Sequence, residues 1–376
     1  MLSYFHRLHN KMMTNYRGLD RYLLYSIFIL ILFGVFLTLA ASPAVAERHH
    51  PPLPSYHFVI RQFLFFIPAI IVMLITALLS VQHIRRISLL VLLGGLGCMV
   101  CVLLFGSEIK GAKRWLNIMG IGLQPSEFVK PAFAVICAWL MASGRLIKKF
   151  PGYTLSIILY IITAGLLFAQ PDIGMLLTIT AIFGVQLLLS GIPMLLVTIL
   201  GGLFAGLLPI AYFCFDHVHA RIDRFLNPAA GEAYQVEKSM ETLHNAGWLG
   251  KGPGEGVVKY ELPDAHTDFI MAVSAEEFGF ILTALLIGLY AFIILRGFWL
   301  IRKENNYFCQ IAVAGLLTQI AFQVIVNMGS TLNMLPTKGM TLPLISYGGS
   351  SLVSVGLAFG IILGLIHSRT LSRGLE

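Results

Sequence analysis

Ten long apolar runs, joined mostly by short polar segments, dominate this sequence of 376 residues. Hydrophobic residues make up 57% of the chain and charged residues only 12%, whereas a soluble domain carries roughly 25% charged residues. An apolar run of about 18 or more residues is long enough to cross a bilayer as a helix. The sequence therefore predicts an all-α polytopic membrane protein with ten transmembrane helices. We place these helices at 22–42, 62–80, 87–105, 126–142, 153–169, 173–190, 193–214, 269–295, 307–328 and 348–366.

The distribution of Lys and Arg among the loops predicts the orientation of these helices. Basic residues are concentrated in one alternate set of loops, which includes both ends of the chain. Because cytoplasmic loops carry an excess of Lys and Arg, we expect both termini in the cytoplasm. The chain then divides into a cytoplasmic segment 1–21, a membrane domain 22–366 and a cytoplasmic tail 367–376, with a long outer loop at 215–268 between helices seven and eight. Since the basic residues follow the topology, the net charge of +8 does not indicate a nucleic-acid partner.

Three acidic residues stand at the mouth of the eighth predicted helix and inside it. Asp268 begins the apolar run, and Glu276 and Glu277 lie eight and nine residues further along. In a continuous helix with a rise of ~1.5 Å per residue, both glutamates would lie about 12–14 Å deeper than Asp268. A carboxylate in the bilayer core costs roughly 2.5–3.5 kcal/mol on insertion scales, so intramembrane acids are candidates for function. Pro263 suits a helix start, which would place Asp264 and Asp268 on one helical face.

The segment 111–130, GAKRWLNIMGIGLQPSEFVK, brings cations to the outer end of the fourth predicted helix. Lys113 and Arg114 are placed to meet phosphate there, and Trp115 is typical of a membrane interface. These residue types indicate a surface that receives an anionic ligand at the outer face.

Polar residues also mark two helix starts. Pro125 is expected to begin the fourth helix, with Ser126 in its first turn. Glu127 and Lys130 are three residues apart and share a helical face, where they would form a structural ion pair, meet substrate, or do both. Asp172 is expected to cap the start of the sixth helix, with substrate contact as the alternative.

The segment 333–351, NMLPTKGMTLPLISYGGSS, interrupts the chain with prolines and glycines just before the last predicted helix. Irregular backbone at membrane depth is tolerated only where it is buried in protein or lines a polar cavity. The segment is therefore expected to line a cavity, with a kinked, tightly packed loop as the alternative. Its hydrogen-bond donors would be Lys338, Ser346, Tyr347, Ser350 and Ser351.

Together, these segments predict cations that face a carboxylate across an outward cavity: Lys113, Arg114, Lys130 and Lys338 opposite Asp268. This layout suits a phosphate-bearing, lipid-tethered ligand with a general base nearby, and it fits a polymerising enzyme or a transporter. Nucleotide binding is not supported, because the glycine-rich GKGPGEG lacks the GK[ST] ending of a phosphate-binding loop. No spacing of His, Cys, Asp or Glu forces these residues onto one ion, so no protein-bound metal is predicted.

Four motifs follow one another along the chain: GAKRW with LQPSE..K, then QPDIG, then GKGPGEG with LPDAHTDFI, and finally PTKGMTLPLISYGGSS. Their order resembles that of the SEDS family (shape, elongation, division and sporulation), from about residue 20 to 366. Within the family, the residues of these motifs are more similar to those of the cell-division branch than to those of the elongation branch. The resemblance implies a ten-span peptidoglycan glycosyltransferase that polymerises lipid II at the outer face of the cytoplasmic membrane.

The resemblance also implies roles for individual residues. The family's essential aspartate corresponds to Asp268, which would act as general base for the acceptor sugar hydroxyl. The family's Glu and Lys correspond to Glu127 and Lys130. The leaving group would be a lipid pyrophosphate, neutralised by the four cations with or without Mg²⁺ or Mn²⁺. We expect these residues to bind substrate: Lys113, Arg114, Trp115, Gln124, Ser126, Glu127, Lys130, Asp172, His266, Thr267, Lys338, Ser346, Tyr347 and Ser350.

Three other functions are alternatives to this one. A lipid II flippase would use the cavity and its charges without a base, an elongation-type polymerase is the alternative within the family, and a structural scaffold would need neither cavity nor base. The family resemblance favours the division polymerase, located in the inner membrane at the division septum.

The resemblance implies partners as well: undecaprenyl-pyrophosphate-linked glycan, membrane lipids, a class B penicillin-binding protein and other division proteins. The sequence itself has no SxxK nucleophile motif in an extramembrane domain, so a second protein has to cross-link the glycan. Small residues on helices seven and ten would permit close approach of a partner helix, with packing inside the protein as the alternative. These residues are Gly201, Gly202, Gly206, Gly356, Gly360 and Gly364.

Overall fold

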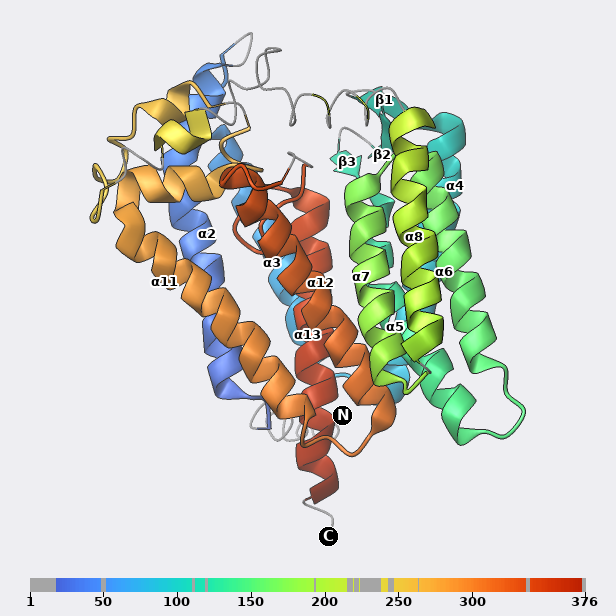
Figure 1. Ribbon diagram of the computed structural model, residues 1–376. Helices are drawn as coiled ribbons and strands as arrows, with labels where there is room; N and C mark the ends of the chain where they lie inside the picture. Colours follow the sequence, from blue (N-terminus) through green and yellow to red (C-terminus); the bar gives the residue numbers. More distant parts are fainter. Residues whose placement is uncertain are drawn as a thin grey trace.

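The computed structural model describes residues 18–48, 52–109, 112–118, 121–192, 194–214, 219, 223, 238–242, 247–262, 264–335 and 339–373. Within these residues, each predicted apolar run coincides with a long helix. The helices are α2 (Arg21–Glu47), α3 (His57–Ala77), α4 (Val81–Phe105), α5 (Pro125–Leu146), α6 (Gly152–Ala169), α7 (Ile173–Leu189), α8 (Met194–Cys214), α11 (Ile270–Ile301), α12 (Tyr307–Thr331) and α13 (Gly349–Arg373). Figure 1 shows them packed as a bundle, with the start of α2 and the end of α13 at the same end.

Eight helices in the described part of the chain are long and apolar enough to cross a membrane. Of the remaining two long helices, α7 is shorter, with 17 residues, and α8 has 21. The chain is thus a polytopic, helical membrane protein as predicted, while the count of ten spans stays a prediction.

Residues with capping side chains set where several helices begin. Asp20 starts α2, Asp172 starts α7 and Asn306 starts α12, each by accepting a backbone N–H of the first turn, at 2.9, 3.3 and 3.1 Å. The capping role predicted for Asp172 is confirmed. Pro125 occupies the first position of α5, also as predicted, because a helix start needs no N–H from that residue.

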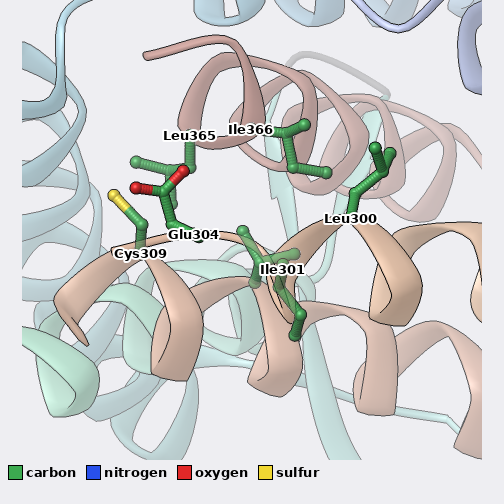
Figure 2. A pocket seen from close by; sticks show the side chains of 7 residues that line it. Leu300, Ile301, Glu304, Cys309, Leu365 and Ile366 are labelled. Atoms are coloured by element: carbon green, nitrogen blue, oxygen red, sulfur yellow. The ribbon is translucent and has the colours of Figure 1, made fainter. Parts of the chain in front are cut away.

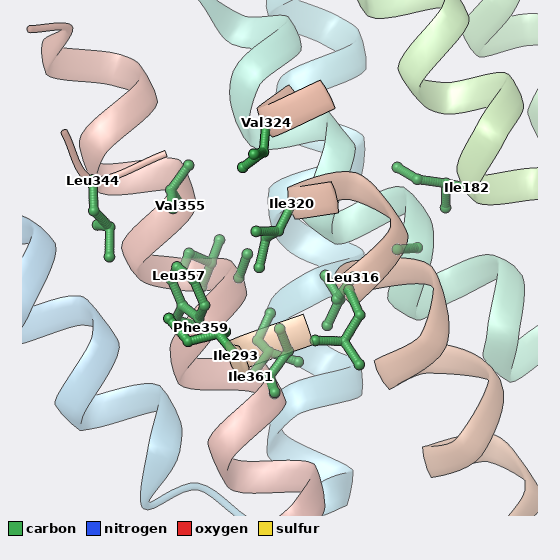
Figure 3. Close-up of a cluster of buried hydrophobic side chains, with 14 of the residues drawn as sticks. Ile182, Ile293, Leu316, Ile320, Val324, Leu344, Val355, Leu357, Phe359 and Ile361 are labelled. Carbon is green, nitrogen blue, oxygen red and sulfur yellow. The ribbon is translucent and has the colours of Figure 1, made fainter. Parts of the chain in front are cut away.

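The apolar core runs along α12, which packs against α5, α7, α11 and α13. Leu316, Ile320 and Val324 lie four residues apart on one face of α12, and all three are buried. Figure 3 shows these side chains near Val355 and Phe359 of α13. This apolar seam fixes α12, whose outer end supports the site described below.

Glycines allow the backbones of α3 and α13 to touch. A Cβ atom added at Gly356 would lie 2.6 Å from the carbonyl oxygen of Ala69, and one added at Gly360 would overlap Met73 and Thr76. The α13 glycines therefore pack inside the protein, and their predicted role in docking a partner is wrong. Among described atoms, a Cβ would meet nothing within 4 Å at three α8 positions, Gly201, Gly202 and Gly206.

A small antiparallel sheet, which the sequence analysis missed, connects α4 to α5. Its strands are β1 (Ser107–Ile109), β2 (Ala112–Ile118) and β3 (Ile121–Leu123), in the order β1-β2-β3. In the register, Trp115 of β2 pairs with Ser107, and Leu116 pairs with Leu123. Figure 1 places the sheet at the end of the bundle where α5 and α7 begin. This is the outer end in the predicted orientation.

Candidate active site

Asp268 lies in a turn that directly precedes α11. The helix begins at Ile270, so the prediction that Pro263 starts it is wrong. Asp264 has a left-handed backbone with φ 53°, and its carbonyl oxygen accepts the N–H groups of Thr267 and Asp268 at 3.0 and 3.1 Å. The two aspartates are therefore joined by a turn and do not share a helical face.

The main chain around Asp268 is held by α12 and by the segment before α13. Asn327 of α12 donates its side-chain N–H to the carbonyl oxygens of Asp268 and Met340, at 3.0 and 2.8 Å. The Ser346 hydroxyl donates to the carbonyl oxygen of Thr267 at 2.5 Å. The structure thus brings together the two motifs, far apart in sequence, that were predicted to meet.

Asp268 is partly buried as a residue, and its carboxylate lies beside the 339–348 segment. A Cβ added at Gly339 would stand 3.8 Å from Asp268 Oδ2. The preceding Lys338, a predicted phosphate ligand, lies outside the described residues. Because the backbone of Asp268 is fixed while its side chain keeps access to solvent, this carboxylate is suited to accept a proton from a bound ligand.

An aromatic cluster stands next to this turn. The ring of His266 lies 4.5 Å from that of Phe58 and 5.2 Å from that of Tyr347, between ring centroids. The backbone N–H of Tyr347 donates to the carbonyl oxygen of His266 at 2.9 Å. Phe58, in the first turn of α3, was missed because it precedes the predicted helix 62–80 and a single aromatic residue carries no distinguishing signal. Asn327 was also missed, although an amide inside an apolar run is such a signal.

A network of polar side chains joins the sheet to the starts of α5, α7 and α13. Arg114 Nη1 lies 3.7 Å from Asp172 Oδ1, and its Nη2 donates to the carbonyl oxygen of Pro171. Gln124 donates its side-chain N–H to Asp172 Oδ2 at 3.4 Å, and its backbone N–H to the Ser350 hydroxyl at 3.1 Å. Four predicted site residues therefore form one network, in which Asp172 partly neutralises Arg114.

The cations of this region differ in how accessible they are. Lys113 is exposed on β2, whereas the Arg114 side chain is only 18% exposed. Lys130 is fully buried, with its Nζ 2.9 Å from Glu127 Oε2. The predicted Glu127–Lys130 ion pair is confirmed, and contact of either residue with substrate stays a prediction.

The other predicted residues occupy interior positions. Trp115 is half-buried and packs over β3, since a Cβ added at Gly122 would lie 3.4 Å from its ring. Ser126 is buried, and its hydroxyl has no hydrogen-bond partner among the described residues. Ser346 also accepts the N–H of Leu342 at 2.8 Å, so its hydroxyl is used within the protein. This packing agrees with the tightly packed alternative for the segment before α13.

A segment of the outer loop, residues 247–262, folds over the start of α11, and we call it the strap. Glu276 and Glu277 are fully buried beneath it and bind it. Gly279 interrupts α11 with φ 78° and ψ 179°, and Figure 1 shows the helix bent there. The bend lies beyond the two glutamates, so the depth of about 12–14 Å expected for them stays a prediction. These acids meet protein rather than lipid.

The residues just before the strap are anchored as well. Lys238 lies 2.6 Å from Glu261 of the strap and 2.8 Å from Glu241. These carboxylates raise the pKa of Lys238 above its usual range. Ser239 donates its hydroxyl hydrogen to the carbonyl oxygen of Thr331, at the end of α12, at 2.9 Å. The described parts of the outer loop are thus bound to the bundle.

A small hollow lies at the opposite end of the bundle. Its lining residues come from the end of α11, the start of α12 and the end of α13: Leu300, Ile301, Glu304, Cys309, Val313, Leu365 and Ile366. Figure 2 shows the Glu304 and Cys309 side chains beside it. It is mainly apolar and remote from Asp268. Within the described residues, no three His, Cys, Asp or Glu side chains are grouped to hold a metal ion.

Comparison with known proteins gives consistent matches over nearly the whole chain. A family model for FtsW, RodA and SpoVE, described as "Cell cycle protein", matches residues 20–371. A Caulobacter vibrioides protein named "Probable peptidoglycan glycosyltransferase FtsW" is 43% identical over 350 residues, which cover 93% of this chain and 90% of that protein. A protein of the same name from Trichlorobacter lovleyi is 33% identical, covering 92% of each chain.

Solved structures are also similar. One, from work on "Structural coordination of polymerization and crosslinking by a peptidoglycan synthase complex", has a TM-score of 0.74 and 27% identity, covering 93% of this chain and 98% of the other. The crystal structure of the Thermus thermophilus rod shape determining protein RodA has a TM-score of 0.66 and 25% identity, covering 93% and 97%.

Proposed function

The chain belongs to the FtsW, RodA and SpoVE family of cell cycle proteins, and we propose that it is a peptidoglycan glycosyltransferase of the FtsW type. It polymerises lipid II into glycan strands at the outer face of the cytoplasmic membrane during cell division. Two relatives that match over nine-tenths of this chain carry the name peptidoglycan glycosyltransferase FtsW, which supports this activity. The similar structure from a peptidoglycan synthase complex supports it as well.

The observation that carries the proposal is the placement of Asp268. Its main chain is fixed by Asn327 and by the Ser346 contact to the neighbouring Thr267, while the residue stays partly exposed, with its carboxylate next to Gly339. A flippase needs binding groups but no base, whereas a glycosyltransferase needs a carboxylate held in one place. A carboxylate whose backbone is fixed and whose residue is partly exposed meets the requirement of a glycosyltransferase.

The reaction joins two lipid-linked sugars. The acceptor hydroxyl oxygen forms a bond to the anomeric carbon of the donor, the bond between that carbon and the pyrophosphate oxygen breaks, and Asp268 takes the hydroxyl proton. The helix N-terminus at Ile270 is positive and favours the ionised carboxylate before the step. The base is therefore charged when it is needed.

Negative charge develops on the leaving lipid pyrophosphate. Lys113 is the exposed cation among the described candidates, and Arg114 lies beside it on β2 with its charge shared with Asp172. We assign the pyrophosphate to these two residues, because Lys130 is buried against Glu127. A Mg²⁺ or Mn²⁺ ion carried by the pyrophosphate would add charge at the same place. The variant Lys113→Ala tests this assignment. It should lose polymerisation and bind lipid II more weakly.

The replacement Asp268→Asn tests the catalytic role. Polymerisation of labelled lipid II by the full chain, purified with its transpeptidase partner, should fall by about 10²–10⁴-fold, because the amide cannot act as a base. Asp264→Asn, in the same turn, is the matched control and should retain activity. Near-normal polymerisation by Asp268→Asn would overturn the assignment. Translocation of labelled lipid II in vesicles, measured in parallel, identifies a flippase if that activity is present and polymerisation is absent.

The chain is a multi-pass membrane protein, and we place both termini in the cytoplasm and the protein at the division septum. Its partners are a class B penicillin-binding protein, which cross-links the strands, and other division proteins. The even number of long helices within the described residues and the shared end of α2 and α13 support placing both termini on the same side of the membrane. Cysteine labelling of each terminus in intact and in opened cells tests it.

A further inference from the structure

Glu276 is bound by four donors of the strap. Its Oε1 accepts the backbone N–H groups of Val257 and Val258, at 2.8 and 2.9 Å, and lies 3.2 Å from Lys251 Nζ. Its Oε2 accepts the backbone N–H of Lys259 at 3.2 Å. Glu276 is fully buried, and its contacts to the N–H groups of Val258 and Lys259 are buried with it, whereas those to Val257 and Lys251 are partly exposed. Three consecutive N–H groups on one carboxylate form a preorganised anion site that the protein fills with its own side chain.

Glu277 reinforces the same junction. Its Oε2 accepts the backbone N–H of Gly254 at 3.0 Å, and its Oε1 pairs with Lys259 Nζ. Lys259 Nζ also donates to the carbonyl oxygens of Ala40 and Gly254, at 3.1 and 3.0 Å. The buried ammonium is therefore satisfied, and it links the strap to α2 as well as to α11.

These contacts close a loop in the chain that contains Asp268. Residues 257–259 are joined to Glu276, so the intervening residues 260–275 form an arch whose two ends are fastened together. Asp268 stands near the middle of this arch. Its other supports are Asn327 and the segment before α13, which hold single points of the main chain. The two ends of the arch are joined by the glutamate side chains and by backbone hydrogen bonds from Lys251 and Gly252 to the carbonyl oxygens of Glu276 and Glu277.

We propose that Glu276, assisted by Glu277, is a positioning residue for Asp268: it fastens the strap to α11 and thereby sets where the arch holds the catalytic carboxylate. The inference rests on the proposed function, since it takes Asp268 as the base. Glu276 does not touch substrate. It acts through the main chain, and its removal should slow turnover while leaving substrate binding largely unchanged.

Glu276→Gln is the principal test, in the full chain purified with its transpeptidase partner. An amide keeps the size of the side chain but turns one oxygen acceptor into a donor that faces backbone N–H groups. A displacement of about 1 Å at a catalytic group costs on the order of 100-fold in rate, so we expect kcat to fall at least about tenfold with KM for lipid II within about twofold. Lys251→Met is the matched control, because it removes one donor and leaves the three backbone N–H contacts. Its kcat should stay near wild type.

A gentler variant covers the case in which Glu276→Gln does not fold. A Cβ added at Gly256 would lie 2.9 Å from Glu276 Oε2, and Gly256 does not require a left-handed backbone. Gly256→Ala therefore shifts the carboxylate without changing any charge, and kcat should fall by about threefold or more, since such displacements act on the reacting geometry.

Three measurements separate the outcomes. If Glu276 matters only for stability, the melting temperature falls but the folded protein turns over with wild-type kcat, and the inference is overturned. A wild-type kcat in Gly256→Ala, with the carboxylate shifted, overturns it as well. If Asp268→Asn retains polymerisation, the proposed function itself fails, which is a distinguishable result.

Discussion

Replacing Gly279 by alanine should disrupt the junction between α11 and the strap. Gly279 has φ 78° and ψ 179°, a region that essentially only glycine occupies. A Cβ added there would lie 2.5 Å from the carbonyl carbon of Leu249 and would overlap the backbone of Gly250 and Trp248. All three neighbours are main-chain atoms, so no side-chain rotation relieves the collision. The strap has to move away from the helix, or the helix has to straighten.

The size of the effect follows from the contacts at this junction. Holding alanine in this backbone region costs on the order of 1–3 kcal/mol. Four backbone hydrogen bonds also join the strap to the helix near the bend, with donors Lys251, Gly252, Phe280 and Ile281 at 2.9–3.2 Å. Each contributes about 0.5–1.5 kcal/mol. Loss of half of them together with the strain gives a destabilisation of at least about 2 kcal/mol.

Thermal unfolding in detergent and limited proteolysis of the strap measure this effect. Gly288→Ala is the control, because this glycine lies on the same helix, is exposed, and has no described atom within 4 Å of an added Cβ. Alanine should be neutral or favourable there by about 0.5–1 kcal/mol, since it is the better helix former. Equal melting temperatures and equal cleavage of the strap in the two variants would refute the reasoning.

Three further predictions concern the bundle interior. Reversing the charge of Glu127 or of Lys130 alone should lower thermal stability, and reversing both should restore it; activity that stays lost in the stable double variant would show that the pair also meets substrate. Gln319→Leu should leave the melting temperature unchanged or raise it, because neither polar atom of that buried side chain has a hydrogen-bond partner among the described residues. Gln186→Leu should lower the melting temperature, because it removes hydrogen bonds of 2.7 and 3.3 Å to two carbonyl oxygens. The reverse order of the two glutamine variants would contradict this. Gly360→Leu should abolish folding of the bundle, measured as loss of monodisperse protein in detergent, and a stable variant would show that α3 and α13 separate easily.

The helices could be predicted from sequence because each is specified locally. An apolar run sets the length, and a residue such as Asp172 or Pro125 sets the start. The sheet could not be predicted in this way. Two of its strands have three residues each, too short for an alternating pattern to be recognised. These two short strands are stabilised by pairing with β2 and by the adjacent helix starts.

The sequence predicted which residues belong to the candidate site, but not all of the contacts that hold them in place. Ion pairing of Glu127 with Lys130 follows from their spacing on a helix. In contrast, the bend at Gly279 depends on the strap, about thirty residues earlier in the chain, and no local pattern reports that contact. From sequence, Glu276 was therefore predicted to be a carboxylate inside the bilayer. In the structure its partners are backbone N–H groups of the same chain.

The contact between α3 and α13 has a consequence for how the protein can move. Two helices whose backbones touch at Gly356 and Gly360 cannot slide or rotate past each other without collision, so they behave as one rigid body. The segment that contacts Thr267 leads directly into α13, and Phe58 of the aromatic cluster belongs to α3. One wall of the site therefore moves only as a single unit. Any motion that admits a bulky lipid-linked substrate or releases a growing polymer has to shift this whole unit and the opposite wall relative to each other.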